Sequence, residues 1–229
     1  MKKIKIGVTD CSKYTNYAKW IASEPNIEAV QLGYSQNNFS QIENCDGILL
    51  TGGEDVHPIF YNKPELLEFC YQDDVDARRD EFEWRVLDYS QKKQLPLLGI
   101  CRGLQIANVF FGGSLIPDIP IFKKTDHSKL EGTDRYHEVV TAPNSLLQNL
   151  THSDKGEVNS AHHQSADRIG EGLIVNASSS EGIIEGLEWA HPKGKSFMLL
   201  VQWHPERMIN QENVFTKNIK NGFINSIIQ

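Results

Sequence analysis

The 229-residue sequence lacks the patterns that mark membrane, disulfide-rich or nucleic-acid-binding proteins. No apolar run approaches the roughly 20 residues that a membrane-spanning helix requires, so we expect no membrane partner. The four cysteines form no C-x-x-C pair and no dense framework, which favours neither a zinc site nor a disulfide scaffold. Lysine and arginine form no run longer than two residues, so we expect no nucleic-acid partner.

Charge and the N-terminal residues favour a cytoplasmic protein with a solvated acidic surface. The formal net charge is −7, which bears mainly on solubility. Residues 1–8 are basic, but they have neither the long apolar core nor the small-residue cleavage site of a signal peptide. We therefore expect this stretch to contain the first strand of the fold. A reducing cytoplasm is the expected location of the protein.

The first half of the chain alternates short apolar segments with amphipathic ones, which is typical of a parallel sheet covered by helices. We expect strands at 5–8, 28–32, 47–50 and 95–100, and helices at 14–23, 76–94 and 104–111. The strand at 95–100 is apolar enough to be buried on both faces. This pattern predicts an α/β fold.

The second half of the chain has a different sequence pattern. Segments 137–140, 173–175, 182–187 and 197–201 have the composition of strands, with few helical patterns between them. They predict an antiparallel extension of the sheet. Apolar residues at helical spacing predict a closing helix at 213–228. No linker or repeat interrupts the chain, so we expect a single domain over residues 1–229.

Cys101 lies in the stretch Gly99-Ile100-Cys101-Arg102-Gly103, a G-x-C-x-G pattern between an expected strand and an expected helix. This is the thiol form of a nucleophile elbow, in which glycines relieve crowding around a sharp turn. The start of a helix also favours the thiolate. The alternative is a buried structural cysteine, the commonest fate of a free thiol.

His204 and Glu206 follow the last expected strand in Gln202-Trp203-His204-Pro205-Glu206. A catalytic thiol needs a base that later protonates the leaving amine, and a third group that orients the imidazole. The two residues suit these roles. Alone, however, a histidine two residues from a glutamate is a common accident.

Thr51-Gly52-Gly53 ends the third expected strand. Acyl transfer needs donors directed at the developing oxyanion, and the backbone amides of Gly53 and Arg102 form a natural pair. An ordinary turn between strand and loop is the alternative.

Seven stretches in this chain order resemble the class I glutamine amidotransferase-like superfamily. Within it they resemble the γ-glutamyl hydrolase branch, similar to γ-glutamyl-γ-aminobutyrate hydrolase. The stretches are Gly52–Pro58, Arg79–Glu83, Gly99–Gln105, Asn108–Leu115, Val158–Gln164, Glu181–Glu188 and Gln202–Glu206. The set as a whole is specific, although no single member is.

The resemblance implies a flavodoxin-like three-layer fold, with a central mostly parallel sheet, flanking helices and a small antiparallel extension. It also implies Cys101 as the nucleophile, His204 as general base and then acid, and Glu206 as the orienting carboxylate. The amides of Gly53 and Arg102 would form the oxyanion hole.

The resemblance further implies residues that bind substrate. Gln105 falls where the superfamily holds the γ-glutamyl group. Ser160, His162 and His163 fall on the segment that faces the α-amino and α-carboxylate end. The stretch 119–137 looks short and polar for the family, so leaving-group specificity is the property least transferable by resemblance.

Histidine pairs raise the question of a metal. His162 and His163, together with His127, His137 and His152, offer many nitrogens, but their spacings match no standard ligand pattern. We therefore expect no metal and no cofactor.

Asp80 and Glu83 lie three residues apart on the expected helix 76–94. We expect a structural role rather than a catalytic one. The two residues would cap the helix or pair with Arg79 and Arg85, because oppositely charged side chains three or four residues apart are neighbours on a helix.

Three functions remain open on the sequence. The first is a free-standing hydrolase that releases glutamate and an amine from a small γ-glutamyl substrate, and the resemblance suggests polyamine or γ-aminobutyrate breakdown. The second is a glutaminase subunit that supplies ammonia to a separate synthetase. The third is a silent binding protein on the same fold, which an intact triad argues against. A homodimer is left open.

Overall fold

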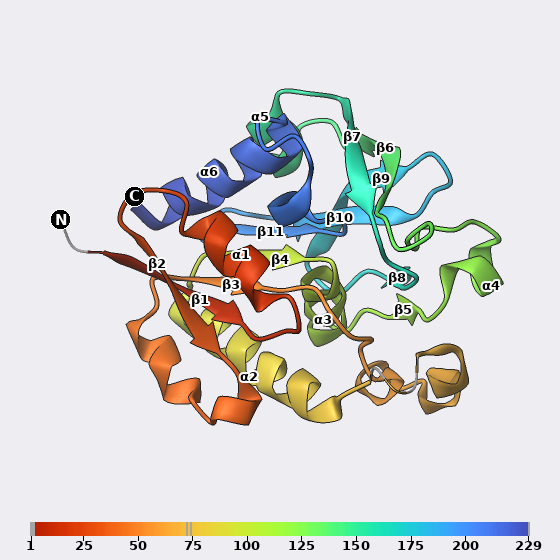
Figure 1. Cartoon of the computed structure of the whole chain (residues 1–229), viewed down its shortest axis with the longest axis horizontal. Helices are drawn as coiled ribbons and strands as arrows, with labels where there is room; N and C mark the ends of the chain where they lie inside the picture. Colours follow the sequence, from red (N-terminus) through yellow and green to blue (C-terminus); the bar gives the residue numbers. More distant parts are fainter. Residues whose placement is uncertain (1–2, 72, 74, 229) are drawn as a thin grey trace.

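The computed structural model describes residues 3–71, 73 and 75–228, and within these ranges a nine-stranded sheet forms the frame of the fold (Figure 1). Its strands in chain order are β1 (Ile4–Thr9), β2 (Ile27–Leu32), β3 (Gly47–Leu50), β4 (Leu97–Ile100), β6 (Arg135–Thr141), β7 (Lys155–Ser160), β9 (Leu173–Ser179), β10 (Ile184–Trp189) and β11 (Met198–Val201). They lie in the order β2-β1-β3-β4-β11-β10-β9-β6-β7. Two short strands, β5 (Leu115–Ile116) and β8 (Ser165–Ala166), pair separately.

The sheet has a parallel half and an antiparallel half. Strands β2, β1, β3, β4 and β11 run parallel, in the order that flavodoxin-like sheets adopt. Strands β10, β9, β6 and β7 continue the same sheet with antiparallel pairing. Figure 1 shows β1 and β2 at one side of the molecule and β6, β7 and β9 at the other. The expected flavodoxin-like fold and its antiparallel extension are both confirmed.

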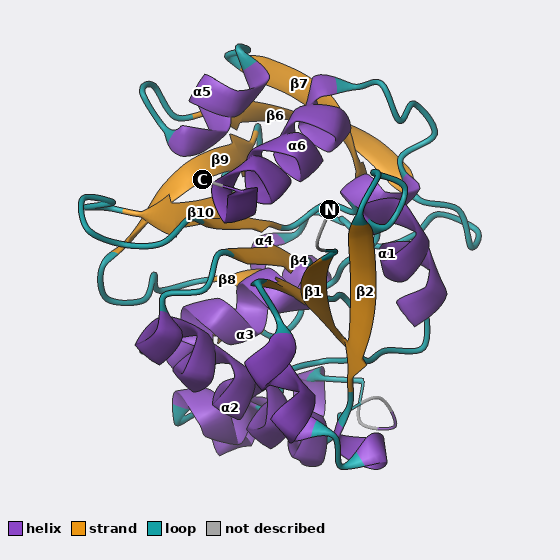
Figure 2. Cartoon of the chain, turned by 90° about the vertical axis from the view of Figure 1, so that its left-hand side faces the viewer, coloured by secondary structure: helices purple, strands orange, loops and turns teal. Residues whose placement is uncertain are grey.

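Helices cover both faces of the sheet (Figure 2). Helices α1 (Tyr14–Ile21) and α6 (Val214–Ile228) pack on one face, and α2 (Ala77–Lys93) and α3 (Arg102–Phe110) on the other. The shorter elements are α4 (Ile119–Lys123), α5 (Leu146–Thr151) and the 3-10 turns η1 (Tyr34–Gln36), η2 (Phe39–Asn44), η3 (Pro58–Tyr61), η4 (Pro64–Phe69) and η6 (Pro205–Arg207).

The central strands are apolar on both sides because both faces are covered. In β3, Leu49 packs into the core beneath α1 and α6, whereas Ile48 and Leu50 pack beneath α2 and α3. In β4, Leu98 packs beneath α1 and α6, and Leu97 packs beneath α2 and α3. The side chains of these five residues of β3 and β4 are fully buried. A strand with two buried faces shows a continuous apolar run in its sequence, which explains why these strands could be predicted.

Several elements of the second half differ from the expectation. Strand β7 and helix α5 were not predicted, nor was α4. The expected closing helix is present as α6. In the described part of the chain, no helix is long and apolar enough to cross a membrane.

Candidate active site

Cys101 occupies a sharp turn between β4 and α3. Its backbone has φ 53° and ψ −105°, a conformation that a residue with a side chain adopts only under strain. Gly103 makes the turn sterically feasible, because a Cβ at this position would lie 2.5 Å from the carbonyl oxygen of Leu50. The thiol is thereby held at the carboxyl edge of the sheet, as the G-x-C-x-G pattern predicted.

His204 reaches the same edge from the neighbouring strand. Strand β11 runs parallel to β4, with Val201 opposite Ile100, and the amide of Cys101 donates to the carbonyl of Val201 at 2.8 Å. The chain therefore leaves both strands at the same end. A Cβ placed on Gly52 would lie 2.9 Å from the His204 ring and 3.4 Å from the Cys101 Cβ, so the two side chains flank one small space.

Glu206 lies where an orienting carboxylate is needed. Its Oε1 is 3.0 Å from Nδ1 of His204, and both side chains are buried. Burial disfavours the imidazolium, but Glu206 and Cys101 outweigh it and raise the pKa of His204 to about 9. The site therefore favours a protonated His204 next to the Cys101 side chain at neutral pH.

Tyr17 is a site residue that the sequence did not reveal. Its hydroxyl lies 3.3 Å from Nδ1 of His204 and accepts a hydrogen bond from the Gly52 amide at 3.0 Å. Burial and the nearby Glu206 raise the pKa of Tyr17 well above its usual range, so the phenol stays neutral. The hydroxyl thus connects the segment Thr51–Gly53, which we call the glycine loop, to the His204 imidazole. A tyrosine on an amphipathic helix gives no sequence signal for such a role.

The backbone amides of Gly53 and Arg102 are the expected oxyanion donors. Gly53 has φ +140°, which an L side chain rarely adopts. Among the described residues, neither the Gly53 amide nor the Arg102 amide donates a hydrogen bond. Both remain available to a ligand, and the oxyanion hole stays a prediction.

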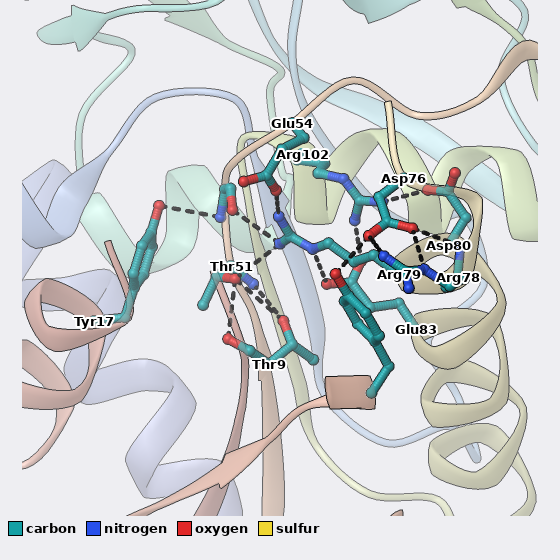
Figure 3. Close-up of polar contacts among 12 residues, drawn as sticks. Thr9, Tyr17, Thr51, Glu54, Asp76, Arg78, Arg79, Asp80, Glu83 and Arg102 are labelled. Atoms are coloured by element: carbon teal, nitrogen blue, oxygen red, sulfur yellow. Dashed lines mark hydrogen bonds and ion pairs between the residues drawn. The ribbon is translucent and has the colours of Figure 1, made fainter. Parts of the chain in front are cut away.

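The Arg102 side chain is part of a buried ionic network (Figure 3). We call Arg79, Asp80, Glu83 and Arg102 the arginine cluster. Arg102 donates to both Asp80 and Glu83, and Arg79 donates to Glu83 Oε1 at 3.1 Å. All four side chains are buried. Burial opposes ionisation of Glu83, but the two guanidinium groups outweigh it and lower its pKa.

The arginine cluster supports the glycine loop from below. Nη2 of Arg79 donates to the Gly52 carbonyl at 2.9 Å and to the Thr51 hydroxyl at 3.1 Å, and Nη1 pairs with Glu54. The expected pairing of Glu83 with Arg79 is confirmed. Pairing with Arg85 is wrong, because that guanidinium lies 4.2 Å over the Phe39 ring.

A cavity of about 150 Å³ opens at the thiol. It is lined by Cys11, Ser12, Lys13, Tyr17, Gly52, Gly53, Cys101, Lys129, Ala161, His204 and Arg207. Besides His204, three of these residues are cationic, namely Lys13, Lys129 and Arg207, and the sequence analysis had not singled them out. Cationic side chains suit the binding of a carboxylate.

Gln105 and Ser160 do not line this cavity. The Gln105 amide donates to the Gln164 carbonyl at 3.1 Å, and the Ser160 hydroxyl donates to the His127 carbonyl at 2.6 Å. Both side chains are buried and serve the protein's own backbone. Substrate binding by either residue therefore stays a prediction that this geometry does not support directly.

His162 and His163 also lie away from the cavity and apart from one another. His162 faces Glu185 in the antiparallel half. His163 stacks on Tyr71, with ring centroids 3.8 Å apart, and its Nε2 is 2.8 Å from Asp55. Ala161, the residue before the pair, lines the cavity instead. The segment is thus at the site as expected, but its histidine side chains point elsewhere.

The fold is that of class I glutamine amidotransferase-like proteins. The Peptidase C26 family model matches residues 16–206, most of the chain. The chain belongs to the Peptidase C26 family.

Named relatives fall into two groups. A Schizosaccharomyces pombe protein that carries the provisional name of a glutamine amidotransferase is 38% identical over 74% of this chain and 65% of its own length. The match to a Mycobacterium tuberculosis protein of similar provisional name, at 34% identity, covers 76% of this chain and 54% of that protein. The chain thus spans between half and two thirds of these two proteins. The γ-glutamyl-γ-aminobutyrate hydrolase PuuD of Escherichia coli is 31% identical over 80% of this chain and 72% of its own length.

Solved structures share the fold at lower identity. A glutamine amidotransferase from Thermotoga maritima superposes with a TM-score of 0.66 and 14% identity, covering 100% of this chain and 97% of that one. At this identity the likeness bears on the fold alone.

Proposed function

We propose that this chain hydrolyses γ-glutamyl amides through a thioester on Cys101, releasing glutamate and an amine. The observation that carries the proposal is the meeting of three groups at one sheet edge. A thiol on a strained turn shares a cavity with His204, whose Nδ1 lies 3.0 Å from Glu206.

In the first half-reaction, the Cys101 thiolate attacks the γ-carbonyl carbon of the substrate. The oxyanion that develops would accept hydrogen bonds from the Gly53 and Arg102 amides. Protonated His204 gives its proton to the leaving nitrogen as the C–N bond breaks. The amine departs and a γ-glutamyl thioester remains.

In the second half-reaction, neutral His204 removes a proton from water, which attacks the thioester carbonyl. The C–S bond breaks, the thiolate and the imidazolium are restored, and glutamate leaves. Glu206 stabilises the imidazolium in both halves and need not itself accept a proton.

The acyl side of the substrate fits the cations of the cavity. Lys13, Lys129 and Arg207 line it, and the α-carboxylate of a γ-glutamyl group needs such partners. Asp134 pairs with Arg207 at 2.7 Å and lies 4.0 Å from Lys129, so it holds both cations in place.

A larger cavity of about 600 Å³ shares Cys11 and Ser12 with the one at the thiol and offers room for the leaving amine. Its lining includes Asp10, Glu54, Asp73, Asp76, Arg78 and Arg79. The two arginines pair with Asp76 and Glu54, which leaves the charge of Asp10 and Asp73 in excess. We therefore propose a preference for leaving amines that carry a further positive charge.

The test is hydrolysis of a panel of γ-glutamyl amides by the purified chain. We expect turnover without any partner, and a higher kcat/KM for γ-glutamyl polyamines than for γ-glutamyl-γ-aminobutyrate. His204→Ala should lower kcat by about 10⁴-fold or more, and Glu206→Gln by less, since an orienting group is less essential than the base. Equal losses would require new roles for the two residues.

The relatives named as glutamine amidotransferases favour a second candidate, a glutaminase subunit. That function predicts glutamine as the preferred substrate and activity that rises only with a synthetase partner. Strong hydrolysis of γ-glutamyl amides by the chain alone would exclude it.

A further inference from the structure

Four titratable side chains converge in the antiparallel half of the sheet, outside the thiol cavity. We call His127, His137, His162 and Glu185 the histidine cluster. They come from the loop after α4, from β6, from the loop between β7 and β8, and from β10. Glu185 is fully buried, and His127 and His162 are only 3% and 4% exposed. Their wide separation along the chain explains why ligand spacing in the sequence gave no sign of them.

The three imidazoles surround one carboxylate oxygen of Glu185. Oε1 of Glu185 lies 3.1 Å from His127 Nδ1, 3.2 Å from His137 Nε2 and 3.6 Å from His162 Nε2. Despite these short distances, none of the three nitrogens and neither Glu185 oxygen has a hydrogen-bond partner among the described residues. The His162 nitrogen is too far away for a hydrogen bond, and the N–H directions of the other two rings do not point at the oxygen. Buried polar atoms without partners are costly, so this arrangement lacks a component that would satisfy them.

The spacing of these atoms fits a common centre. Zinc binds imidazole nitrogen and carboxylate oxygen at about 2.0–2.1 Å, so neighbouring ligand atoms in a tetrahedral site lie about 3.3 Å apart. The separations of 3.1, 3.2 and 3.6 Å bracket this value. The ligand atoms of His127, His137 and Glu185 all lie within 4.8 Å of one another, and the His162 nitrogen falls outside this group.

His162 is oriented as a metal ligand would be. Its Nδ1 lies 2.9 Å from the backbone carbonyl oxygen of Gln164, which can only accept, so Nδ1 carries the hydrogen. Nε2 then presents a lone pair toward Glu185. A hydrogen bond of this kind from the outer ring nitrogen accompanies most histidine ligands and fixes their tautomer.

We propose that His127, His137 and Glu185 bind a divalent transition-metal ion of the zinc class, and that the His162 ring moves closer on binding to supply the fourth ligand. Three imidazoles and one carboxylate are a donor set that zinc accepts. Four protein ligands would fill a tetrahedral shell and leave no open position, so the role of the ion is structural. This proposal replaces the expectation of no metal, which rested on sequence spacing alone.

The metal would position one wall of the thiol cavity. Lys129 lies two residues after His127, and Ala161 directly precedes His162; both line the cavity with Cys101. The ion would join their segments to β6 and β10. Coordination would then hold the later part of the stretch 119–137, whose first residue, Ile119, packs in a small apolar cluster with Ile116 and Ile183.

The test is metal binding by the untagged chain in a Cys101→Ala background, so that the active-site thiol cannot contribute. Metals are first removed with a chelator, and the chain is then dialysed against zinc and freed of unbound metal. Elemental mass spectrometry should find about one zinc per chain. Cobalt should bind at the same site and give the visible absorption of a tetrahedral complex.

Two ligand variants and one control locate the site. Glu185→Gln and His137→Asn should each weaken zinc binding by at least about 100-fold. His137 is the most exposed ligand, with a side chain 17% exposed, so its variant serves if Glu185→Gln fails to fold. His152→Asn is the matched control, because the His152 side chain is exposed and its backbone has a left-handed conformation that asparagine tolerates. It should bind zinc as the parent chain does.

The proposal is overturned if the reconstituted parent chain binds neither zinc nor cobalt. It is equally overturned if both ligand variants, folded by circular dichroism, keep the metal. Because the readout is metal content, these outcomes are independent of whether the chain hydrolyses γ-glutamyl amides.

Discussion

The arginine cluster and the histidine cluster are both buried sets of ionisable side chains, but their polar atoms are satisfied differently. In the arginine cluster, each carboxylate accepts hydrogen bonds from a guanidinium, and the charges balance without outside help. In the histidine cluster, a single carboxylate faces three imidazoles with no hydrogen bond among them. Arginine keeps its charge at any ordinary pH, whereas histidine does not. In the first cluster both carboxylates have guanidinium partners, and only Nε of Arg102 lacks a partner among the described residues, whereas the second cluster calls for a cation.

Removal of one cation from the arginine cluster should have the largest effect on stability. Arg102→Leu leaves the carboxylates of Asp80 and Glu83 buried without their partner, so we expect the free energy of unfolding to fall by about 3–5 kcal/mol. Urea denaturation at neutral pH measures it. A loss below about 1 kcal/mol would show that the cluster is not the complete ion-pair network described above.

Zinc should stabilise the chain through the histidine cluster alone. At free zinc of 100 times its dissociation constant, binding to the folded state adds about 2.7 kcal/mol to the free energy of unfolding. Glu185→Gln should abolish this gain. Thermal unfolding with and without a chelator provides the measurement, and a gain that survives in Glu185→Gln would remove the contrast between the clusters.

Asp80 should give the arginine cluster a pH dependence. Burial, opposed by Arg102, raises the pKa of Asp80 from its usual 3.8 to about 6. The folded state therefore keeps a proton that the unfolded state releases. Its contribution to stability is full below pH 3.8 and is lost as pH rises through 6.

Comparison with Asp80→Asn isolates this effect. Between pH 4 and 6 the parent chain should lose on the order of 1–2 kcal/mol relative to the variant, as followed by urea denaturation in steps of pH. Parallel stability curves for the two chains would show that Asp80 is already ionised when folded.

The smallest effect is expected at Arg85. This residue lies on the same helix as Asp80 and Glu83, but its guanidinium stacks on Phe39 instead of joining the arginine cluster. Arg85→Leu should cost less than about 1 kcal/mol. If Arg85→Leu lowered the free energy of unfolding as much as Arg102→Leu does, the stability of α2 would not depend on whether an arginine belongs to the arginine cluster.

The parallel half could be predicted from the sequence because its strands are buried on both faces. Strand β3 was predicted with its observed bounds, Gly47–Leu50, and β4 within two residues. The turn at Cys101 was also readable, since its glycines and its place between strand and helix are local features.

The antiparallel half of the sheet was harder to predict from the sequence, also for physical reasons. Strand β7 carries polar and small residues along most of its length, so it has no apolar run. Helix α5 has only six residues, and its one local signal is Ser145, whose side chain accepts a hydrogen bond from the Gln148 amide. The histidine cluster draws its members from four separate segments, and only the folded chain brings them together.

The central claim, that Cys101 forms the γ-glutamyl thioester, is tested most directly by mass spectrometry of the intact protein after rapid quenching with a γ-glutamyl amide. Cys11 provides the matched control, because its thiol lines the same cavity. We predict an added γ-glutamyl group on the parent chain and on Cys11→Ala, located at Cys101, and neither adduct nor turnover for Cys101→Ala. An adduct at Cys11, or turnover that persists in Cys101→Ala, would contradict the account.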